Sequence, residues 1–256
     1  GSEMCIRDSI SPIKYFQMSP AFTSNNRTVR DESGSIIHRN TTVMFRQDIN
    51  WIDLANFLES YFRDSKKVDV YSFACSDGSE PYSLTASIKN ECLNPNKFFP
   101  IMASDYDDEI IKEAKKARYT LTNTEFDSMR RATRNKWDKY FNMLTSDTIE
   151  PNNKTKNCVN FKTEDIIDGL DKVKKGPKVI MARNFWPYLK SEDKAKILEK
   201  LKSKMDDDSL LIIGAFDQDA IKFDRELSSL GFEEVEYTDY TRWIGFEPHL
   251  VWKAAS

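Results

Sequence analysis

Polar and charged residues follow four short apolar runs of this 256-residue chain, at positions where strands would end. Glu80 follows the run "VYSFAC", Asp105 ends "IMASD", Asp165 ends "FKTED", and the segment "ARNFWPYL" carries Asn184 and Tyr188. In open α/β sheets, ligands bind beyond the carboxyl ends of the strands, near the point where the strand order reverses. The four places therefore predict a ligand site at one edge of a parallel sheet.

The first two places carry the most specific chemistry. In "CSDGSEP", Gly78 allows the backbone to approach a ligand closely, and Pro81 suits the first turn of a helix. Glu80 lies beside that helix start, where the helix dipole favours a negative charge. Asp105 can accept hydrogen bonds from a ribose diol, but it can equally cap a helix that begins near Asp107. Both interpretations of Asp105 are open from the sequence.

The glycine pattern narrows the class of ligand. Neither G-x-G-x-x-G nor G-x-x-x-x-G-K-[ST] occurs, so both common phosphate-binding loops are missing from the sequence. An adenosyl ligand without phosphates agrees better with this pattern. The sequence thus favours S-adenosylmethionine, whose positive charge would be stabilised by neighbouring carboxylates.

The elements that must position these residues alternate between strand and helix patterns. Such alternation predicts right-handed crossover units and a mostly parallel sheet. An insertion around residues 120–157 interrupts the rhythm, and two strand-like pieces near the C-terminus are too close for another crossover helix, which predicts an antiparallel hairpin there. The predicted strands and helices, in chain order, are "VDVYSFAC", "PYSLTASIKNECL", "FFPIMASD", "DEIIKEAKKARY", "CVNFKTED", "KVIMARNF", "SEDKAKILEKLKSKM", "SLLIIGAF", "AIKFDRELSSLGF", "EEVEYTDY" and "HLVWKA".

The segment before the predicted sheet divides into an arm and a helix. Residues 1 and 2 resemble a cloning scar, and residues 1–39 form a polar arm in which "RTVRDESGSIIHR" predicts a hairpin. Residues 49–62 show the apolar spacing of an amphipathic helix. We therefore expect an arm over 1–39 and one large domain over 40–256.

Bulk composition excludes several classes of protein. The 38 Lys and Arg residues against 41 Asp and Glu residues give a net charge of −3, so we expect no nucleic-acid partner. The longest apolar runs are too short to cross a bilayer, and no basic and apolar leader opens the sequence. Four dispersed cysteines and two histidines predict reduced thiols and no metal centre. We therefore expect a cytoplasmic protein without membrane insertion.

Four blocks, in the same order along the chain, resemble the chemotaxis receptor methyltransferase family, CheR. They are "NTTVMFRQ", "ACSDGSEPYSL", "ASDYDDEIIKEAKKARY" and "ARNFWPYL". The resemblance implies a Rossmann-like sheet that binds S-adenosylmethionine and releases S-adenosylhomocysteine. It also implies methyl transfer to glutamate side chains of a receptor, so the expected partner is a protein substrate such as a chemoreceptor cytoplasmic domain.

The same resemblance assigns residues to roles. It places Glu80 at the amino-acid end of the cofactor and Asp105 at the ribose, and it places Arg46 and Tyr188 at the methyl-transfer centre as catalytic residues. Simpler alternatives are a surface arginine at 46 and a packed aromatic at 188. The full set of cofactor-binding residues that the resemblance implies is Asn40, Thr42, Arg46, Ala74, Glu80, Asp105, Asp165, Ile166, Asn184 and Phe185.

Two other functions are open at this point. The chain departs from the family pattern at Ser79, where the family has Glu, and at Asp165, where it has Asn. Cofactor binding is expected to survive both changes. The short N-terminal segment and the altered "FWPYL" leave another protein or a small molecule open as the acceptor. The third possibility is a non-catalytic module that binds the cofactor and signals through its conformation.

Overall fold

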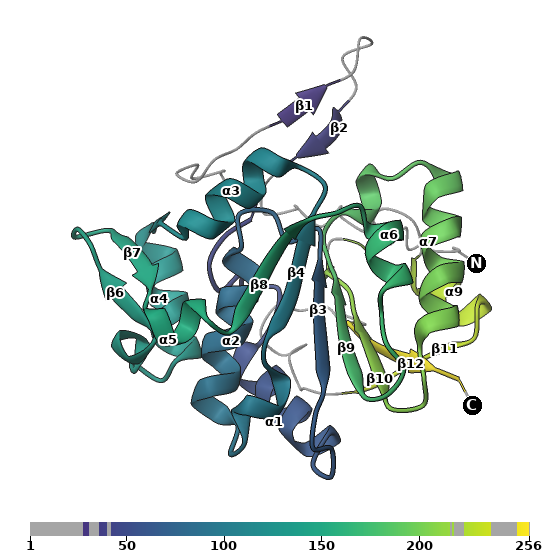
Figure 1. Cartoon of the computed structure of the whole chain (residues 1–256), viewed down its shortest axis with the longest axis horizontal. Helices are drawn as coiled ribbons and strands as arrows, with labels where there is room; N and C mark the ends of the chain where they lie inside the picture. The colour runs from purple at the N-terminus through teal and green to yellow at the C-terminus, as the bar shows by residue number, and fades with distance from the viewer. Residues whose placement is uncertain are drawn as a thin grey trace, which may run out of the picture.

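The computed structural model describes residues 28–30, 36–39, 42–215, 217, 223–236 and 250–255. Asn40 and the turn of the predicted hairpin, residues 31–35, lie outside these residues. On either side of that turn, β1 (Thr28–Arg30) and β2 (Ile36–Arg39) pair in antiparallel fashion, which confirms the predicted hairpin pairing. Figure 1 shows this hairpin projecting from the body of the molecule.

A seven-stranded sheet forms the centre of the molecule (Figure 1). Five neighbouring strands are parallel, and β12 is antiparallel to both of its neighbours, as predicted for the C-terminal pair. That pair lies at one edge of the sheet, with β12 inserted between β10 and β11. In order across the sheet the strands are β11 (Phe232–Glu234), β12 (Val251–Ala254), β10 (Ser209–Ile212), β9 (Lys178–Ala182), β3 (Asp69–Phe73), β4 (Ile101–Asp105) and β8 (Val159–Thr163).

Both faces of this sheet are buried. Successive residues of a strand point to opposite sides, so each strand contributes side chains to both faces. In β9, Val179 and Met181 join one apolar cluster while Ile180 and Ala182 join the other. Figure 1 shows α1 and α2 on one side of the sheet and α6, α7 and α9 on the other. These helices span Trp51–Tyr61 (α1), Ser79–Glu91 (α2), Ile166–Asp171 (α6), Ser191–Lys204 (α7) and Phe223–Ser229 (α9).

A second sheet is inserted between α3 (Asp108–Lys116) and β8. It contains three short antiparallel strands in the order β5, β7, β6, and it lies to the side of the main sheet in Figure 1. The inserted segment contains, in chain order, β5 (Tyr119–Thr120), α4 (Asn123–Ala132), η2 (Trp137–Lys139), β6 (Phe141–Met143), β7 (Thr148–Pro151) and α5 (Asn153–Lys156). Thr122 and Glu125 form a reciprocal capping box that starts α4.

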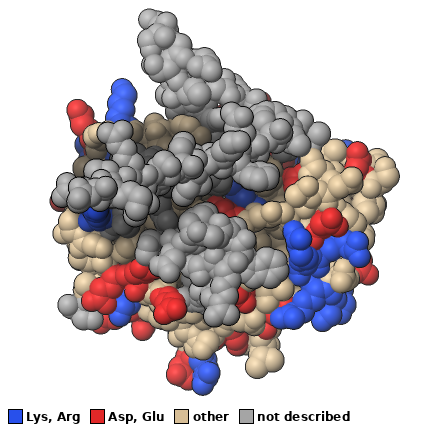
Figure 2. Space-filling model, turned by 180° about the vertical axis from the view of Figure 1, so that it is seen from behind, with Lys and Arg blue, Asp and Glu red and all other residues tan. Residues whose placement is uncertain are grey.

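Charge is mixed over the visible surface. Figure 2, seen from behind Figure 1, shows Lys and Arg side chains gathered toward one side and Asp and Glu side chains toward the lower part of the other. None of the helices within the described ranges is long and apolar enough to cross a membrane.

Candidate functional site

The strand order places the candidate site between β3 and β9. From β3 the chain moves to β4 and β8 on one side, whereas β9 and β10 lie on the other side of β3. At such a reversal, neighbouring crossovers leave in opposite directions and open a crevice beyond the carboxyl ends of the strands. The turns after β3, β9 and β10 therefore meet at this edge.

The turn after β3 has an unusual backbone. Ala74 and Ser76 both adopt left-handed conformations with φ of 52°, and Gly78 has φ of 85°. A Cβ atom on Gly78 would lie 2.8 Å from the ring of Phe161, so only glycine is accommodated at this position. Non-glycine residues in this conformation are uncommon and cluster at functional sites. The turn is thus a shaped backbone surface at the head of α2.

Asp105, at the end of β4, holds this turn in place. Its carboxylate accepts the backbone N–H of Ser76 at 2.9 Å and that of Asp107 at 3.1 Å. The alternative role as the helix cap is wrong, because the N-cap of α3 is Asp107, whose side chain accepts from Glu109 and Ile110. Asp105 is only 3% exposed, so its carboxylate lies inside the edge of the sheet.

Glu80 lies in the first turn of α2, as predicted, and is bound on both of its oxygens. The Ser72 hydroxyl donates to one oxygen at 3.1 Å, and the Arg183 guanidinium donates to the other at 2.6 Å. Arg183 also donates to Asp48 at 2.7 Å and lies over the Trp51 ring, 5.9 Å from its centre. A buried ion-pair network therefore joins the end of β9 to the start of α2 and to the segment before α1.

The charge state of this network follows from its geometry. Burial by itself would lower the pKa of Arg183, but the carboxylates of Asp48 and Glu80 outweigh burial and raise that pKa above its ordinary value. Arg183 is therefore a fixed positive charge at the end of β9.

Asn184 follows Arg183, and its backbone is bound to the end of β10. Its φ is 62°, and its backbone N–H donates to the carboxylate of Asp217 at 2.7 Å. Gly214 donates to the same oxygen at 2.7 Å. Burial raises the pKa of Asp217 to about 7, against the opposing effect of these two N–H donors.

Several buried polar atoms around Arg183 have no hydrogen-bond partner among the described residues. These atoms are Asp48 Oδ2, Arg183 Nε, Asn184 Oδ1 and Asp217 Oδ1. Buried polar atoms are normally paired, so an unpaired group of this kind is unusual. All of these atoms are enclosed by protein, so they describe the polar interior behind the strand ends and not the surface that a ligand would contact.

The segment before α1 is anchored to the same crevice. Phe45, with φ of 49°, donates its backbone N–H to the Ser83 hydroxyl of α2 at 2.8 Å, and Asp48 pairs with Arg183. Arg46 lies between these two anchors and is half-buried, and its carbonyl accepts from the Trp51 indole at 2.9 Å. Thr42 is also half-buried.

The remaining predicted residues lie at the rim. Asp165 is exposed and caps α6 by accepting the Ile167 N–H at 2.8 Å, and the neighbouring Glu164 N–H donates to the Asp105 carbonyl at 2.9 Å. Ile166 is half-buried against the second apolar cluster.

On the β9 side of the rim, Phe185 stacks on Trp186 with ring centres 4.8 Å apart. Tyr188, in η3 (Trp186–Tyr188), is 36% exposed. Its aromatic ring is therefore not packed away in the core.

The structure brings Ala74, Glu80, Asp105 and Asn184 around one crevice, either directly or through Ser76 and Arg183. Sequence reasoning missed Asp48, Arg183 and Asp217. Arg183 had a usable signal, since it is a charged residue directly after a fully buried strand. Asp48 had none.

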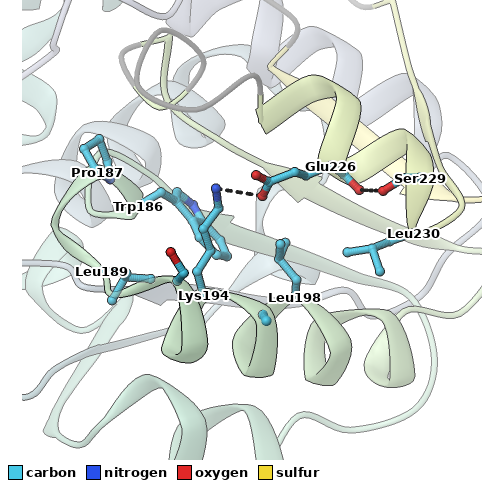
Figure 3. A pocket seen from close by; sticks show the side chains of 10 residues that line it. Trp186, Pro187, Leu189, Lys194, Leu198, Glu226, Ser229 and Leu230 are labelled. Carbon is cyan, nitrogen blue, oxygen red and sulfur yellow. Dashed lines mark hydrogen bonds and ion pairs between the residues drawn. The ribbon is translucent and has the colours of Figure 1, made fainter.

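A second hollow lies on another part of the surface, between η3, α7 and α9 (Figure 3). Its volume is about 420 Å³, and Trp186, Pro187 and Leu198 contribute apolar walls. Figure 3 shows the ion pair between Lys194 and Glu226, whose charged atoms are 2.7 Å apart, within this hollow. None of the strand-end carboxylates lines it.

The part of the chain that the structure describes has no candidate metal site. It contains no group of three His, Cys, Asp or Glu side chains placed to hold an ion.

Comparison with known proteins gives a family match. The family model for the CheR methyltransferase SAM-binding domain matches residues 40–231. A chemotaxis protein methyltransferase of Listeria monocytogenes serovar 1/2a is 28% identical over 190 residues, which cover 73% of this chain and 69% of the relative. Another of Listeria innocua serovar 6a is 29% identical over 193 residues, with the same coverage.

Among solved structures, the magnesium protoporphyrin IX methyltransferase (ChlM) of Synechocystis PCC 6803 with bound SAM is similar over 83% of this chain and 82% of that chain. Its sequence identity is 13% and its TM-score is 0.37.

Proposed function

This chain belongs to the CheR family of S-adenosylmethionine-dependent methyltransferases, and from that premise we propose that it methylates glutamate carboxylates of a chemotaxis receptor or similar signalling protein. The acceptor is suggested by the relatives, which are named chemotaxis protein methyltransferases. The observation that carries the proposal is the set of strand ends at β3, β4 and β9, where left-handed backbone turns meet Glu80, Asp105 and Arg183 in one hydrogen-bonded arrangement.

The proposed cofactor contacts follow from the positions of the acidic residues. Asp105 would accept from the ribose hydroxyls, and Glu80 would face the amino-acid end of the cofactor. A carboxylate can accept about four hydrogen bonds, so the bonds that each residue makes within the protein do not prevent these contacts. Ala74 and Asn184 would line the pocket between them, with Asp165 and Ile166 near the adenine.

Three further residues complete the proposed pocket on the substrate side. Phe185 would lie near the sulfonium, and Asn40 and Thr42 would cover the cofactor from the segment that Phe45 and Asp48 anchor. Support for this arrangement comes from the half-buried position of Thr42 and Phe185.

Little acid–base chemistry is required of the protein. When bound, S-adenosylmethionine supplies an electrophilic methyl group, and a glutamate side chain is already ionised near neutral pH, so no general base is needed. We propose that the guanidinium of Arg46 holds the acceptor carboxylate, because its planar fork matches that geometry. Tyr188, exposed on η3, would donate a hydrogen bond from its hydroxyl to the same carboxylate, which stays ionised. Both residues would act by aligning the reactants and excluding water.

The direct test is transfer of a tritiated methyl group from S-adenosylmethionine to a chemoreceptor cytoplasmic fragment, measured as base-labile ester. Arg46→Ala should lower the rate on the order of 100-fold, the cost typical of a misplaced reactant, while binding of S-adenosylhomocysteine changes little. The matched control is Arg63→Ala, at an exposed arginine beyond the far end of α1.

Each outcome of this assay has a separate meaning. Equal activity of Arg46→Ala and the wild type would remove Arg46 from the catalytic centre. Cofactor binding without labelling of the receptor fragment would contradict the proposed acceptor and favour another protein or a small molecule.

A further inference from the structure

Asp217 connects the ends of two strands, β9 and β10, and it is not among the proposed cofactor contacts. It follows β10, is fully buried, and accepts two backbone N–H groups on one carboxylate oxygen, from Asn184 and from Gly214, each at 2.7 Å. Its own N–H donates to the Gly214 carbonyl at 3.1 Å, which closes a tight turn. The end of β10 is thereby tied to the turn that follows β9.

The turn that Asp217 holds is strained. Asn184 has φ of 62°, in the left-handed region that non-glycine residues seldom adopt, although asparagine adopts it more often than most. Such a conformation persists only where its surroundings fix it. The Asn184 N–H donates to Asp217, and the side chain of Asn184 lies close over Gly214, where a Cβ would be 2.2 Å from Asn184 Oδ1.

The side chains of Asn184 and Asp217 also each keep one buried oxygen without a hydrogen-bond partner among the described residues. Both oxygens are acceptors, and both come from the turns that border the crevice. The turns after β9 and β10 therefore meet in a polar interior that the chain itself encloses.

We propose that Asp217 is a positioning residue of the cofactor pocket, which holds Asn184 in the left-handed conformation that presents Asn184 and Phe185 to the cofactor. This inference rests on the proposed function, since it assumes that the crevice binds S-adenosylmethionine. Asp217 acts through Asn184 and is not itself assigned to the reaction.

Charged groups around Asp217 affect its pKa, so its role can be tested by changing the pH. Arg183 and Asp48 face it with opposite effects on its pKa, and Glu80 lies beyond Arg183. An ionised carboxylate is a stronger acceptor for the two N–H groups than a neutral one. Affinity for S-adenosylhomocysteine should therefore rise as pH increases through about 7.

The experiment compares Asp217→Ala and Asp217→Asn by calorimetric titration with S-adenosylhomocysteine at pH 6 and pH 8. Asp217→Ala loses the acceptor and should raise Kd at least about tenfold, equivalent to about 1.4 kcal/mol. Asp217→Asn keeps an acceptor oxygen, so it should bind nearly as well as the wild type at pH 6 but lack the gain in affinity at pH 8.

Asp206→Asn is the matched control at the opposite ends of the same two strands. Asp206 also accepts a backbone N–H, from Gly176 at 2.7 Å, and pairs with the buried Lys178. This variant should lose stability to urea without any change in Kd.

The outcomes separate the inference from the proposed function. No binding to the wild type would contradict the cofactor site itself. Binding by the wild type with unchanged Kd in folded Asp217→Ala would overturn the positioning role. If Asp217→Ala does not fold, the same gain in affinity at pH 8 in Asp217→Asn as in the wild type would overturn it. An equal loss of affinity in Asp206→Asn would also overturn it, because the effect would then be one of general stability.

Discussion

Carboxylates at the strand ends have structural partners as well as a proposed ligand. Asp105 accepts two backbone N–H groups from the turns that follow β3 and β4, and Glu80 is bound by Ser72 and Arg183. We therefore expect replacement of either residue to change both the local backbone and the proposed affinity for the cofactor. The choice of substitution decides which of the two effects is measured.

Asp105→Asn tests the ribose assignment at the residue scale. The Ser76 and Asp107 N–H groups bind different oxygens of Asp105, so asparagine keeps one of these bonds. It also loses the charge that strengthens a hydrogen bond to a ribose hydroxyl. Hydrogen bonds to charged groups contribute about 1.5–3 kcal/mol, so Kd for S-adenosylhomocysteine should rise on the order of tenfold or more. Titration calorimetry provides the value, and an unchanged Kd would contradict the ribose assignment.

Asp77 gives a prediction for stability against pH. Burial raises its pKa from 3.8 to about 6 in the folded chain, although the Ser79 backbone N–H donates to it at 2.9 Å. A carboxyl group with a raised pKa binds its proton more tightly in the folded state than in the unfolded state. The stability it contributes is full below about pH 4 and is lost as pH rises through about 6.

The measurement for Asp77 is urea unfolding of the wild type and of Asp77→Asn at pH 4.5 and pH 7. As pH rises, the free energy of unfolding of the variant should increase relative to that of the wild type by at most about 3 kcal/mol. Each unit of pKa shift corresponds to about 1.4 kcal/mol. A difference in unfolding free energy that does not vary with pH would show that Asp77 is not buried as described.

At this scale the sequence predicted the acids but not their partners. Glu80 and Asp105 were identified because each follows a local apolar run, which is a pattern visible within ten residues. Asp48 and Arg183 are 135 residues apart, and nothing in either local pattern indicates that they pair. Asp217 was missed for the same reason, since its partner Asn184 belongs to another strand end.

At the scale of elements, Arg183 connects three segments that are distant in the chain. Its guanidinium reaches Glu80 on α2 and Asp48 before α1 from the end of β9. Removing one partner of a buried pair costs about 3–5 kcal/mol, because the other charge is left without compensation.

Arg183→Gln should therefore lower the free energy of unfolding by about that amount, about 3–5 kcal/mol in urea titrations. The control is Lys116→Gln, because Lys116 pairs with Glu113 at 2.7 Å with both side chains exposed, where such pairs contribute about 1 kcal/mol or less. Equal losses in the two variants would show that the Arg183 network does not connect these elements in the folded chain.

Helix α2 shows why burial is harder to predict than secondary structure. The sequence predicted this helix, yet its polar residues Ser83, Thr85 and Ser87 are fully buried. Each hydroxyl donates to the carbonyl four residues earlier, at 2.7–2.9 Å, so no outside partner is needed. A hydropathy pattern treats such residues as exposed, because it does not count hydrogen bonds made within the helix.

For the whole molecule, the alternation of strands and helices was sufficient to predict the main sheet. Strands such as β9 are buried on both faces and read as continuous apolar runs, which is the pattern of a parallel sheet between two helical layers. The placement of β12 between β10 and β11 was not predicted, because strand order depends on packing between distant segments.

The central claim is that this sheet carries one S-adenosylmethionine site at the crevice between β3 and β9. The most direct measurement is calorimetric titration of the full chain with S-adenosylhomocysteine, repeated with Glu80→Gln. The account predicts saturable binding of one molecule per chain and a higher Kd in the variant. No detectable heat of binding at high protein concentration, or equal binding by Glu80→Gln, would contradict it.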